Sequence, residues 1–343
     1  MRVFSGIRPT GDLHIGNYLG AIKQWIELQK THDCVFCIVD LHAITTPYQP
    51  ENLKRNILEQ TIAYLAAGLD PEKCIFFIQS EVKEHVELSW LLGTITPLGE
   101  LKRMTQFKEK SKKHPEYINA GLLNYPLLMA ADILLYKTDL VPVGKDQEQH
   151  VELTREIARR FNKMFGEVFK EPKVLLSEGQ KIMSLQNPKK KMSKTDNPSG
   201  CLGIFDEPEI ITKKIMSAVT DKGKVIKYDP IKKPGISNLL TIYSLFTQAR
   251  QSRAKGEDET LVSSPFGKKI KSIEKNFKNK GYEEFKKSLA KVLIDSLEPF
   301  RRKRKELLSR EVYIREVLNQ GQKRAQVIAQ STLQEVKKKM GLL

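Results

Sequence analysis

The sequence predicts an α/β protein in which a doubly wound parallel sheet is followed by an all-helical C-terminal domain. Two observations carry this prediction. In the first half, short apolar runs alternate with segments of helical spacing, and this β-α-β-α-β order favours a parallel sheet with helices on both faces. In the second half the pattern is helical almost throughout, with no internal repeats.

The elements of the first half follow from their apolar spacing. Continuous apolar runs predict strands over 3–7, 34–41, 74–80 and 139–144. Residues recurring at helical spacing predict helices over 16–30, 51–67, 83–92 and 146–164, the second of them closed by Gly68. The stretch 98–136 is mostly helical in pattern, and we expect it to form a helical insertion around 95–136.

A polar segment, NPKKKMSKTDNPSG at 187–200, separates the two halves. Its proline, glycine and lysine residues predict a mobile exposed loop. Beyond it, helices are expected over 207–219, 237–249, 282–309, 311–319 and 321–340. We therefore predict one domain over 1–200 and a second, basic and helical, over 201–343.

Composition excludes several classes of protein. The chain is 40% apolar and 29% charged, which is typical of a globular protein. No apolar run is long enough to span a membrane, and the N-terminus has no hydrophobic signal region, so we expect a cytoplasmic protein without a membrane partner. Four cysteines form no disulfide framework, and Cys34 and Cys37 fall inside a buried strand, which favours structural thiols over a redox or zinc site.

Charge is concentrated in the C-terminal part. Residues 1–200 have a net charge of +3, whereas residues 201–343 have a net charge of +14. The densest run, Arg301 to Lys305, contains no aromatic residue, so phosphate contact fits it better than base stacking. A solvated helix face is the alternative for any single run, but the bias of the whole domain favours a nucleic-acid partner.

The turn after the first strand, Gly6 to Asn17, has features of a phosphate site. In an open parallel sheet, ligands bind beyond the carboxyl ends of strands, where helix N-termini favour phosphate. Gly11 and Gly16 would allow a nucleotide to approach the backbone, and His14 and Asn17 could donate to phosphate oxygens. The alternative is a glycine-rich turn whose histidine only caps the helix. The segment is not GxGxxG, so a dinucleotide site is disfavoured.

The lysine-rich segment KKKMSKT at 189–195 suits closure over a triphosphate. Its ammonium groups would neutralise charge that develops on a departing pyrophosphate. Taken alone, the same segment fits a solvated basic linker.

The third motif is the apolar helix YPLLMAADILLY at 125–136. Tyr125, Met129, Asp132 and Tyr136 share one helix face. A carboxylate in so apolar a run requires a partner. That partner is a nearby arginine or backbone amide, or a ligand with a single N–H donor beside a flat apolar ring, and an indole has those properties.

Together, these motifs resemble a known family. GDLHIGN resembles the first signature of class I aminoacyl-tRNA synthetases and KMSKT resembles the second. With YPLLMAADILLY, VPVGKDQEQH and KPGISNLL in order, essentially the whole chain is similar to bacterial-type tryptophanyl-tRNA synthetases. Asn17 replaces the second histidine of many class I enzymes, although tryptophan enzymes commonly have asparagine there. Thr195 replaces the usual serine but keeps a hydroxyl, so we expect function to survive.

The resemblance implies roles for individual residues. It implies a Rossmann-like catalytic domain with His14, Asn17, Lys191 and Lys194 as catalytic residues. The implied ATP-binding residues are Arg8, Pro9, Thr10, Gly16, Asn17, Gly144, Lys145, Asp146, Ile182, Lys191, Met192, Ser193, Lys194 and Thr195. The implied tryptophan-binding residues are Asp132, Met129, Tyr125, Gln147, Phe4, Val39, His42, Val141 and Val143.

The resemblance also implies a reaction and partners. L-Tryptophan and ATP would form tryptophanyl-adenylate, and the tryptophanyl group would pass to the 3′ end of tRNA(Trp). Mg²⁺ would travel with the ATP phosphates, because no carboxylate cage for a protein-held metal is visible. A symmetric homodimer is implied, with its interface around residues 80–130, and 201–343 would meet the tRNA anticodon.

Three alternatives remain at this point. The first is another adenylate-forming nucleotidyltransferase of the same fold, such as pantothenate synthetase, but such an enzyme would have no need for the basic helical half. Tyrosyl-tRNA synthetase would require a different side-chain set around Asp132. A non-catalytic RNA-binding relative would have no need for both phosphate elements, the one at His14 and Asn17 and the one at Lys191 and Lys194.

Overall fold

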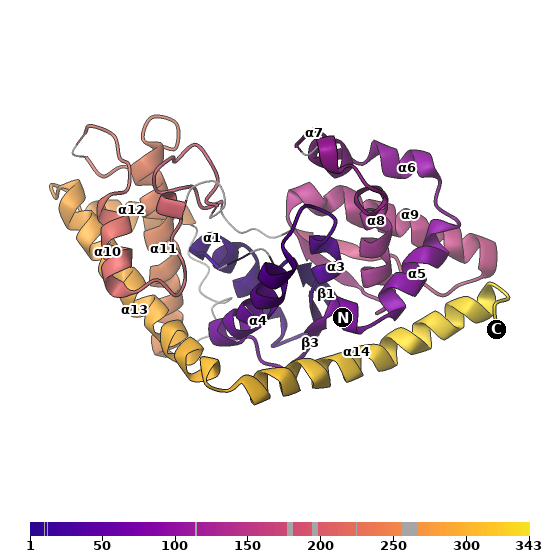
Figure 1. Ribbon diagram of the computed structural model, residues 1–343. Coiled ribbons are helices and arrows are strands. Elements are labelled where there is room, and N and C mark those ends of the chain that lie inside the picture. The colour runs from indigo at the N-terminus through magenta and orange to yellow at the C-terminus, as the bar shows by residue number, and fades with distance from the viewer. Residues whose placement is uncertain are drawn as a thin grey trace. The chain divides into compact units, whose positions relative to one another are not determined.

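The computed structural model describes residues 1–9, 11, 13–113, 115–176, 181–193, 198–223, 225–255 and 266–343. It confirms the predicted fold class. Five parallel strands form one sheet in the order β3-β2-β1-β4-β5, and helices make up most of the rest of the chain (Figure 1).

The elements have the following bounds. The strands are β1 (Arg2–Ile7), β2 (Asp33–Ile38), β3 (Cys74–Ile78), β4 (Leu140–Val143) and β5 (Lys173–Leu176). The helices are α1 (Ile15–Asn17), α2 (Lys23–Leu28), α3 (Asp40–Ala43), α4 (Pro50–Ala67), α5 (Glu84–Gly93), α6 (Leu98–Arg103), α7 (Thr105–Lys113), α8 (Ala120–Leu134), α9 (Glu148–Phe165), α10 (Pro208–Met216), α11 (Pro234–Lys255), α12 (Phe266–Asn276), α13 (Tyr282–Leu308) and α14 (Glu311–Lys339). A π-helix over Tyr18–Ile22 joins α1 to α2, and 3-10 helices occupy Gln79–Glu81, Pro115–Tyr117, Lys145–Gln147 and Pro198–Gly200.

The chain divides into two compact units. One comprises Met1–Gly11, Gln24–Ser177 and Leu307–Leu343, and it contains the whole sheet. The other comprises Asp12–Lys23 and Glu178–Glu306, and its regular elements in the described residues are helices. This division differs from the predicted boundary at residue 200 in two ways: residues 12–23 and 178–200 group with the second unit, and the last helix, α14, packs with the sheet unit.

The strand order places a switch point at the middle of the sheet. From β1 the chain passes outward through β2 to β3, and then returns to β4 on the other side of β1. The pairing runs in register from Arg2↔Asp33 to Ile7↔Ile38 between β1 and β2, and Val3 pairs with Leu140 of β4. In such sheets the crevice beyond the carboxyl ends of the strands at the switch point is where ligands bind.

Two predicted strands end earlier than expected. The apolar run 34–41 stops being a strand at Ile38, because Asp40 begins α3, and the run 74–80 leaves the sheet after Ile78. Asp40 ties the two ends together, since its carboxylate accepts hydrogen bonds from the Ser80 amide and hydroxyl. The sequence did not predict β5, a short strand of four residues.

The helix α14 covers the outer edge of β3. It runs alongside that strand and α5 (Figure 1). Arg324 donates to the carbonyl oxygens of Pro71 and Cys74, both at 3.1 Å. Lys337 forms an ion pair of 2.9 Å with Glu87 of α5. These contacts protect an edge that would otherwise present unpaired backbone groups.

Gly321 allows α14 to approach the strand backbone. A Cβ atom at this position would lie 1.8 Å from the carbonyl oxygen of Phe76. The sequence-based prediction of two helices, 311–319 and 321–340, is wrong, because α14 is continuous through Gly321. The glycine serves close packing and does not end the helix.

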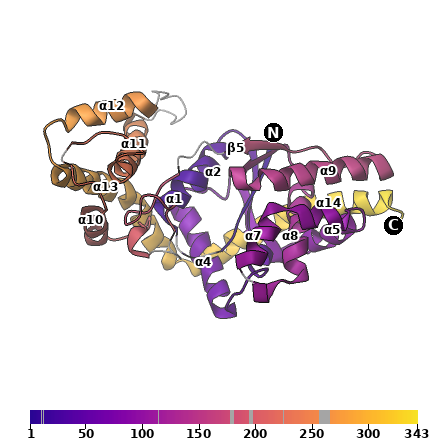
Figure 2. The ribbon, with the colours of Figure 1, turned by 90° about the horizontal axis from the view of Figure 1, so that it is seen from above.

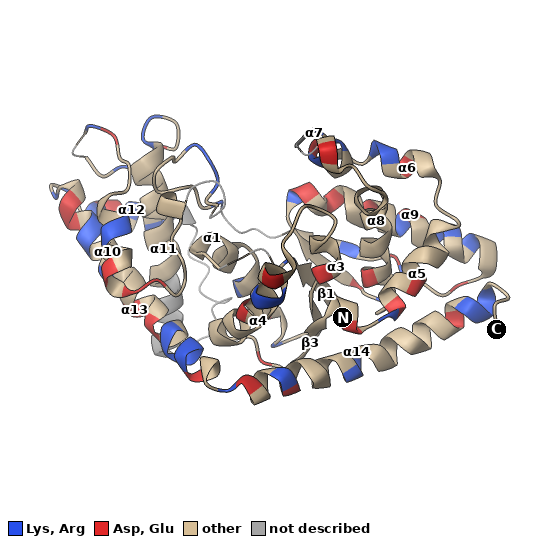
Figure 3. Cartoon of the chain, viewed as in Figure 1, with Lys and Arg blue, Asp and Glu red and all other residues tan. Residues whose placement is uncertain are grey.

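The second unit has its own aromatic core. The Tyr18 ring lies 5.1 Å from the Phe300 ring and 6.4 Å from the Phe246 ring, so the π-helix packs with α11 and α13. Lys286 of α13 is buried, and its ammonium group donates to the carbonyl oxygens of Met216, the last residue of α10, and of Ala218. Lysine and arginine residues gather on α12 and along α13 (Figure 3).

Two other expectations can be compared with the fold. All four cysteines are buried and free, as the structural interpretation of Cys34 and Cys37 predicts. Among the described residues, none of the helices has the length and apolar character needed to cross a bilayer.

We predict that Gly321→Ala lowers the free energy of unfolding by about 2–3 kcal/mol, because the new methyl group overlaps the Phe76 carbonyl and forces α14 away from β3. Urea denaturation would measure the change. The matched control is Gly99→Ala in α6, where the new Cβ meets only an Arg103 nitrogen at 3.9 Å. Equal stability of the two variants would contradict the account of α14.

Candidate active site

The centre of the first unit is the buried carboxylate of Asp132, which is 1% exposed. Three side chains donate to it. Gln79 Nε2 lies 2.7 Å from Oδ1, and His85 Nδ1 lies 2.6 Å from the same oxygen. His42 Nε2 lies 2.9 Å from Oδ2. Asp132 is therefore not a lone carboxylate, and its partners are neither an arginine nor a backbone amide.

These donors keep Asp132 ionised. Burial alone would raise the pKa of the Asp132 carboxyl group, since it disfavours the charged form. The hydrogen bonds from His42 and His85, and the electrostatic interaction of both rings with the carboxylate, outweigh this penalty and lower the pKa of Asp132 to about 2. At neutral pH, Asp132 is thus an acceptor only.

Aromatic rings surround this carboxylate. The other ring nitrogen of His85, Nε2, lies 2.8 Å from the Tyr136 hydroxyl. Tyr136 in turn stacks on Phe4, with ring centroids 5.5 Å apart and planes at 8°. On the other side, the His42 ring meets the Tyr125 ring edge-on at 6.0 Å.

The structure brings most of the predicted tryptophan pocket together. The shared face of α8 is confirmed, with Tyr125 and Asp132 buried, Met129 half-buried and Tyr136 just past the end of the helix. Phe4, Val39, Met129, Tyr136, Val141 and Val143 belong to one apolar cluster with the buried part of α8. The helices α5, α8 and α9 pack together around it (Figure 2).

A second polar group lies at the other end of α8. The Tyr125 hydroxyl is 2.6 Å from His150 Nε2, and the Lys110 ammonium lies 4.3 Å from the centre of the Tyr125 ring. Burial lowers the pKa of His150 to about 4, with a contribution from the charge of Lys110. Burial and the neighbouring Arg8 lower the pKa of Lys110 to about 8. Two cations, Arg8 and Lys110, thus converge near Tyr125.

Three of the predicted ATP-binding residues, Gly144, Lys145 and Asp146, follow β4. Gly144 precedes the 3-10 helix Lys145–Gln147, and its lack of a side chain lets the Asp146 carboxylate approach the backbone. The Asp146 carboxylate accepts a hydrogen bond of 2.8 Å from Gln147 Nε2. Among the described residues, the Gln147 side chain makes no other polar contact, and it does not contact Tyr125.

In the second unit, His14 caps the short helix α1. Its Nδ1 accepts from the backbone N–H of Gly16 at 3.1 Å and of Asn17 at 3.3 Å. Asn17 Oδ1 accepts from the His14 backbone N–H in return, which completes a capping box. Burial and the charge of Lys191 lower the pKa of His14 to about 4. The ring is neutral at pH 7, and because Nδ1 accepts, its proton lies on Nε2.

The segment 182–192 folds back next to this cap. Met192 N–H donates to Ile182 O at 2.9 Å, and Ser184 N–H donates to Lys190 O at 2.9 Å. Ile182 Cβ would lie 3.8 Å from a Cβ at Gly16, so the two are neighbours. The Asn238 side chain of α11 accepts a hydrogen bond from the Met183 backbone N–H and donates one to the Met183 carbonyl oxygen. Met192 is buried, so this part of the predicted exposed loop is anchored.

The remaining predicted residues divide into two groups. Thr10, Lys194 and Thr195 lie outside the described residues. Pro9 is buried after β1, and Ser193 is partly buried next to Met192. The sequence analysis missed Gln79, His85 and His150. The available signals were two histidines on predicted helices. His85 lies near the buried start of the helix at 83–92, and His150 lies within the helix at 146–164.

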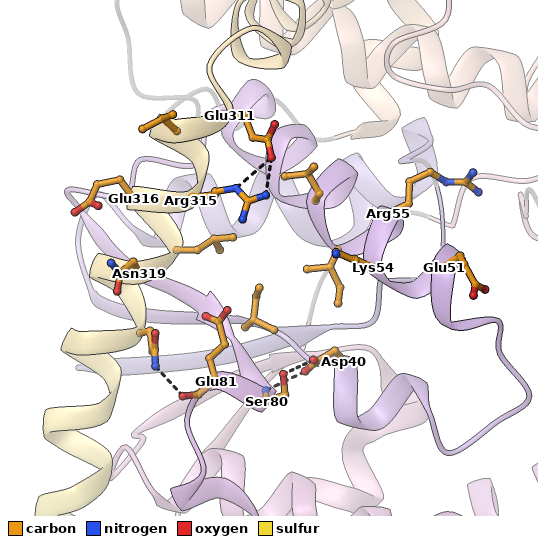
Figure 4. Close-up of a pocket in the computed structure, with 16 residues that line it drawn as sticks. Asp40, Glu51, Lys54, Arg55, Ser80, Glu81, Glu311, Arg315, Glu316 and Asn319 are labelled. Carbon is orange, nitrogen blue, oxygen red and sulfur yellow. Dashed lines mark hydrogen bonds and ion pairs between the residues drawn. The ribbon is translucent and has the colours of Figure 1, made fainter.

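A large cavity lies elsewhere in the first unit. It has a volume of about 1060 Å³ and lies among α4, the start of α3, the end of β3 and the start of α14 (Figure 4). Its polar lining includes both signs of charge, with Arg315 paired to Glu311 and Asp40 bonded to Ser80. None of the predicted site residues lines it. Among the described residues, no cluster of three or more His, Cys, Asp or Glu side chains could hold a metal ion.

The chain matches a known family, the class I aminoacyl-tRNA synthetases, over most of its length. A family model described as class I tRNA synthetases (W and Y) matches residues 1–298. The tryptophan–tRNA ligase of Caldanaerobacter subterraneus subsp. tengcongensis is 52% identical over 344 residues, covering 100% of this chain and 98% of the relative. That of Helicobacter pylori strain 26695 is 48% identical, covering 100% and 99%.

Solved structures agree. Tryptophanyl-tRNA synthetase from Mycoplasma pneumoniae superimposes with a TM-score of 0.83 at 37% identity, covering 100% of this chain and 98% of that one. The enzyme from Campylobacter jejuni, complexed with ADP and tryptophan, gives 0.82 at 36% identity and covers both chains fully. The chain belongs to the class I tRNA synthetases for tryptophan and tyrosine, and within them to the tryptophan–tRNA ligase family.

We predict that buried His150 makes stability fall at mildly acidic pH. In the unfolded chain it binds a proton near pH 6.5, whereas its folded pKa is about 4, so the unfolded state gains protons first as the pH drops. This residue alone costs about 2 kcal/mol between pH 8 and pH 5. Urea unfolding of His150→Gln should show a loss smaller by that amount. An identical loss in both proteins would contradict a neutral buried His150.

Proposed function

We propose that the chain activates L-tryptophan with ATP and transfers the tryptophanyl group to the 3′ end of tRNA(Trp). Membership of the tryptophan–tRNA ligase family supports this proposal. The structural observation that carries it is the ionised acceptor Asp132, which is held by three donors and flanked by the rings of Tyr125 and Tyr136 through His42 and His85. An indole, a flat ring with one N–H donor, complements such an acceptor among aromatic rings.

The first step requires alignment and charge neutralisation. The tryptophan carboxylate attacks the α-phosphorus of ATP, and pyrophosphate leaves. The attacking group is already ionised, so no general base is needed. His14 presents Nε2–H as a donor because its Nδ1 is committed to the helix cap. We assign phosphate contacts to His14, Asn17 and Lys191, and also to Lys194 from its motif.

Mg²⁺ is proposed to enter with the ATP phosphates and to neutralise their charge. We assign the nucleotide to Arg8, Gly144, Lys145, Asp146 and Ile182. The convergence of Arg8 and Lys110 beside Tyr125 supports an anionic ligand in that region of the first unit. The Tyr125 hydroxyl and Gln147 are assigned to the α-amino group of tryptophan.

Selectivity is proposed to rest on Asp132. A phenylalanine side chain would leave one acceptor position of this buried carboxylate unpaired. Sites that depend on such a hydrogen bond discriminate by ~10⁴ or more. This supports tryptophan over phenylalanine, whereas the similarity to tryptophan–tRNA ligases is what disfavours the tyrosine-activating and non-catalytic alternatives.

The tRNA is proposed to bind the basic helices of residues 201–343. Part of the run on α13 is already committed, since Arg301 pairs with Glu298 at 2.7 Å and Arg304 stacks on Phe205. Arg302 and Lys305 are exposed and form no ion pair within the described residues, so they are the better candidates for phosphate contact. We propose the cytoplasm, where tRNA is charged, as the place of the reaction.

A homodimer is proposed through α5 and α6. Trp90 is 75% exposed, and Val86 and Leu98 are each 54% exposed. They line a cavity of about 450 Å³ with Leu101 and Leu127, within the range 80–130. A contiguous exposed apolar patch of this kind is typical of a protein interface.

We predict ATP–pyrophosphate exchange with tryptophan and with none of the other standard amino acids, in the absence of tRNA. In Asp132→Asn the amide supplies a donor where the indole needs an acceptor, so KM for tryptophan should rise and selectivity over tyrosine should fall by about 100-fold or more. Exchange with tyrosine alone in the wild-type protein would overturn the pocket assignment. Unchanged selectivity in the variant would exclude Asp132.

We predict that Trp90→Glu yields a folded monomer, because it places a charge in the apolar patch but leaves the core of α5 unchanged. Sedimentation velocity over a dilution series would measure the association state. Val312→Glu, at an apolar residue that is 83% exposed on α14, is the control and should remain dimeric. A wild-type protein that stays monomeric at micromolar concentration would contradict the proposed interface.

A further inference from the structure

His85 is a buried histidine to which the proposed reaction assigns no role. It lies at the second position of α5, is 0% exposed, and both of its ring nitrogens have partners. Since the Asp132 carboxylate only accepts, His85 Nδ1 must donate to it. The Tyr136 hydroxyl can accept from or donate to Nε2, so it fits the ring in either protonation state.

The two oxygens of Asp132 differ in occupancy. Oδ1 accepts from both His85 and Gln79, whereas Oδ2 accepts only from His42. A carboxylate oxygen offers about two acceptor positions. Within the described residues, Oδ1 is therefore full and Oδ2 retains one acceptor position.

We propose that His85 is a positioning residue for tryptophan selection, which with Gln79 saturates Oδ1 of Asp132 so that the indole N–H is accepted at Oδ2. This inference rests on the proposed function. It identifies which oxygen recognises the substrate and which residues, themselves without substrate contact, determine that choice.

The surroundings of His85 fix its ring. Tyr136 holds Nε2 and itself stacks on Phe4, while Phe77 packs against the His85 ring at 5.8 Å. A ring held at both nitrogens and on one face cannot rotate to release Asp132. The carboxylate plane is then set before any ligand arrives, which is the preorganisation that precise recognition requires.

The same donors keep the acceptor ionised. The titratable groups around Asp132 are His42 from α3, His85 from α5, Cys37 from β2 and Tyr136 after α8, with Asp40, Glu81 and Glu84 farther out. Without the His85 donor, burial would be opposed mainly by His42, and the pKa of Asp132 would rise. A protonated Asp132 presents a hydroxyl donor, and it would no longer favour a ligand with an N–H donor over one without it.

The test compares tryptophan with 3-(benzofuran-3-yl)alanine, in which a ring oxygen replaces the indole N–H. The full chain is assayed by ATP–pyrophosphate exchange, and the readouts are the ratio of kcat/KM values for the two amino acids and KM for tryptophan. His85→Leu removes the donor, and His85→Asn keeps an N–H at the Nδ1 position. Leu88→Ala, also buried on α5, is the control for a general packing defect.

We expect His85→Leu to lower the discrimination ratio at least about tenfold and to raise KM for tryptophan by a similar factor. His85→Asn should restore both readouts, and Leu88→Ala should change neither. If His85→Leu retains both wild-type readouts, the proposal is overturned. If it does not fold, Gln79→Met decides, because that amide is the other donor on Oδ1, and wild-type readouts there overturn the proposal.

The outcomes separate this inference from the proposed function. If the wild-type protein exchanges tryptophan but the variants discriminate normally, only the role of His85 fails. If the wild-type protein shows no exchange with tryptophan, both proposals fail together.

Discussion

The hydrogen bonds to Asp132 are the interaction on which the first unit depends. A buried carboxylate that loses a partner costs about 3–5 kcal/mol, so its donors must be placed reliably. They come from three segments, with His42 on α3, Gln79 after β3 and His85 on α5. The ends of β2 and β3 and the start of α5 are therefore fixed in relation to α8.

The register of the sheet places these donors, and α14 stabilises that register by packing against the outer strand. Residues of β2 and β3 pair from Cys34↔Cys74 to Ile38↔Ile78, so both strands end level. His42 lies four residues beyond the end of β2 and Gln79 directly follows β3, and both donate to the Asp132 carboxylate. Because β3 is the edge strand, its position depends on what covers it, and α14 does so through Gly321 and Arg324. A C-terminal helix thus supports a site whose residues lie more than 150 positions earlier in the chain.

Local periodicity predicted much of this arrangement, and chain-distant contacts account for what it missed. Helical spacing placed Tyr125, Met129, Asp132 and Tyr136 on one face, and the structure confirms that face. The partners of Asp132 lie 90, 53 and 47 residues away, and no period in a sequence reports which distant side chain meets a given carboxylate. Gly321 shows the converse error, since a glycine that serves close packing has the same letter as one that ends a helix.

The two interpretations of His14, helix cap and phosphate donor, are compatible. A neutral imidazole has one acceptor and one donor nitrogen, and which is which depends on its surroundings. The backbone N–H groups of Gly16 and Asn17 occupy Nδ1 as an acceptor, and burial beside Lys191 keeps the ring neutral at pH 7. The proton is thereby forced onto Nε2. The cap is then the reason that His14 can donate. The same holds for Asp132, because neighbouring groups determine, before a ligand binds, whether each of these atoms donates or accepts a hydrogen bond.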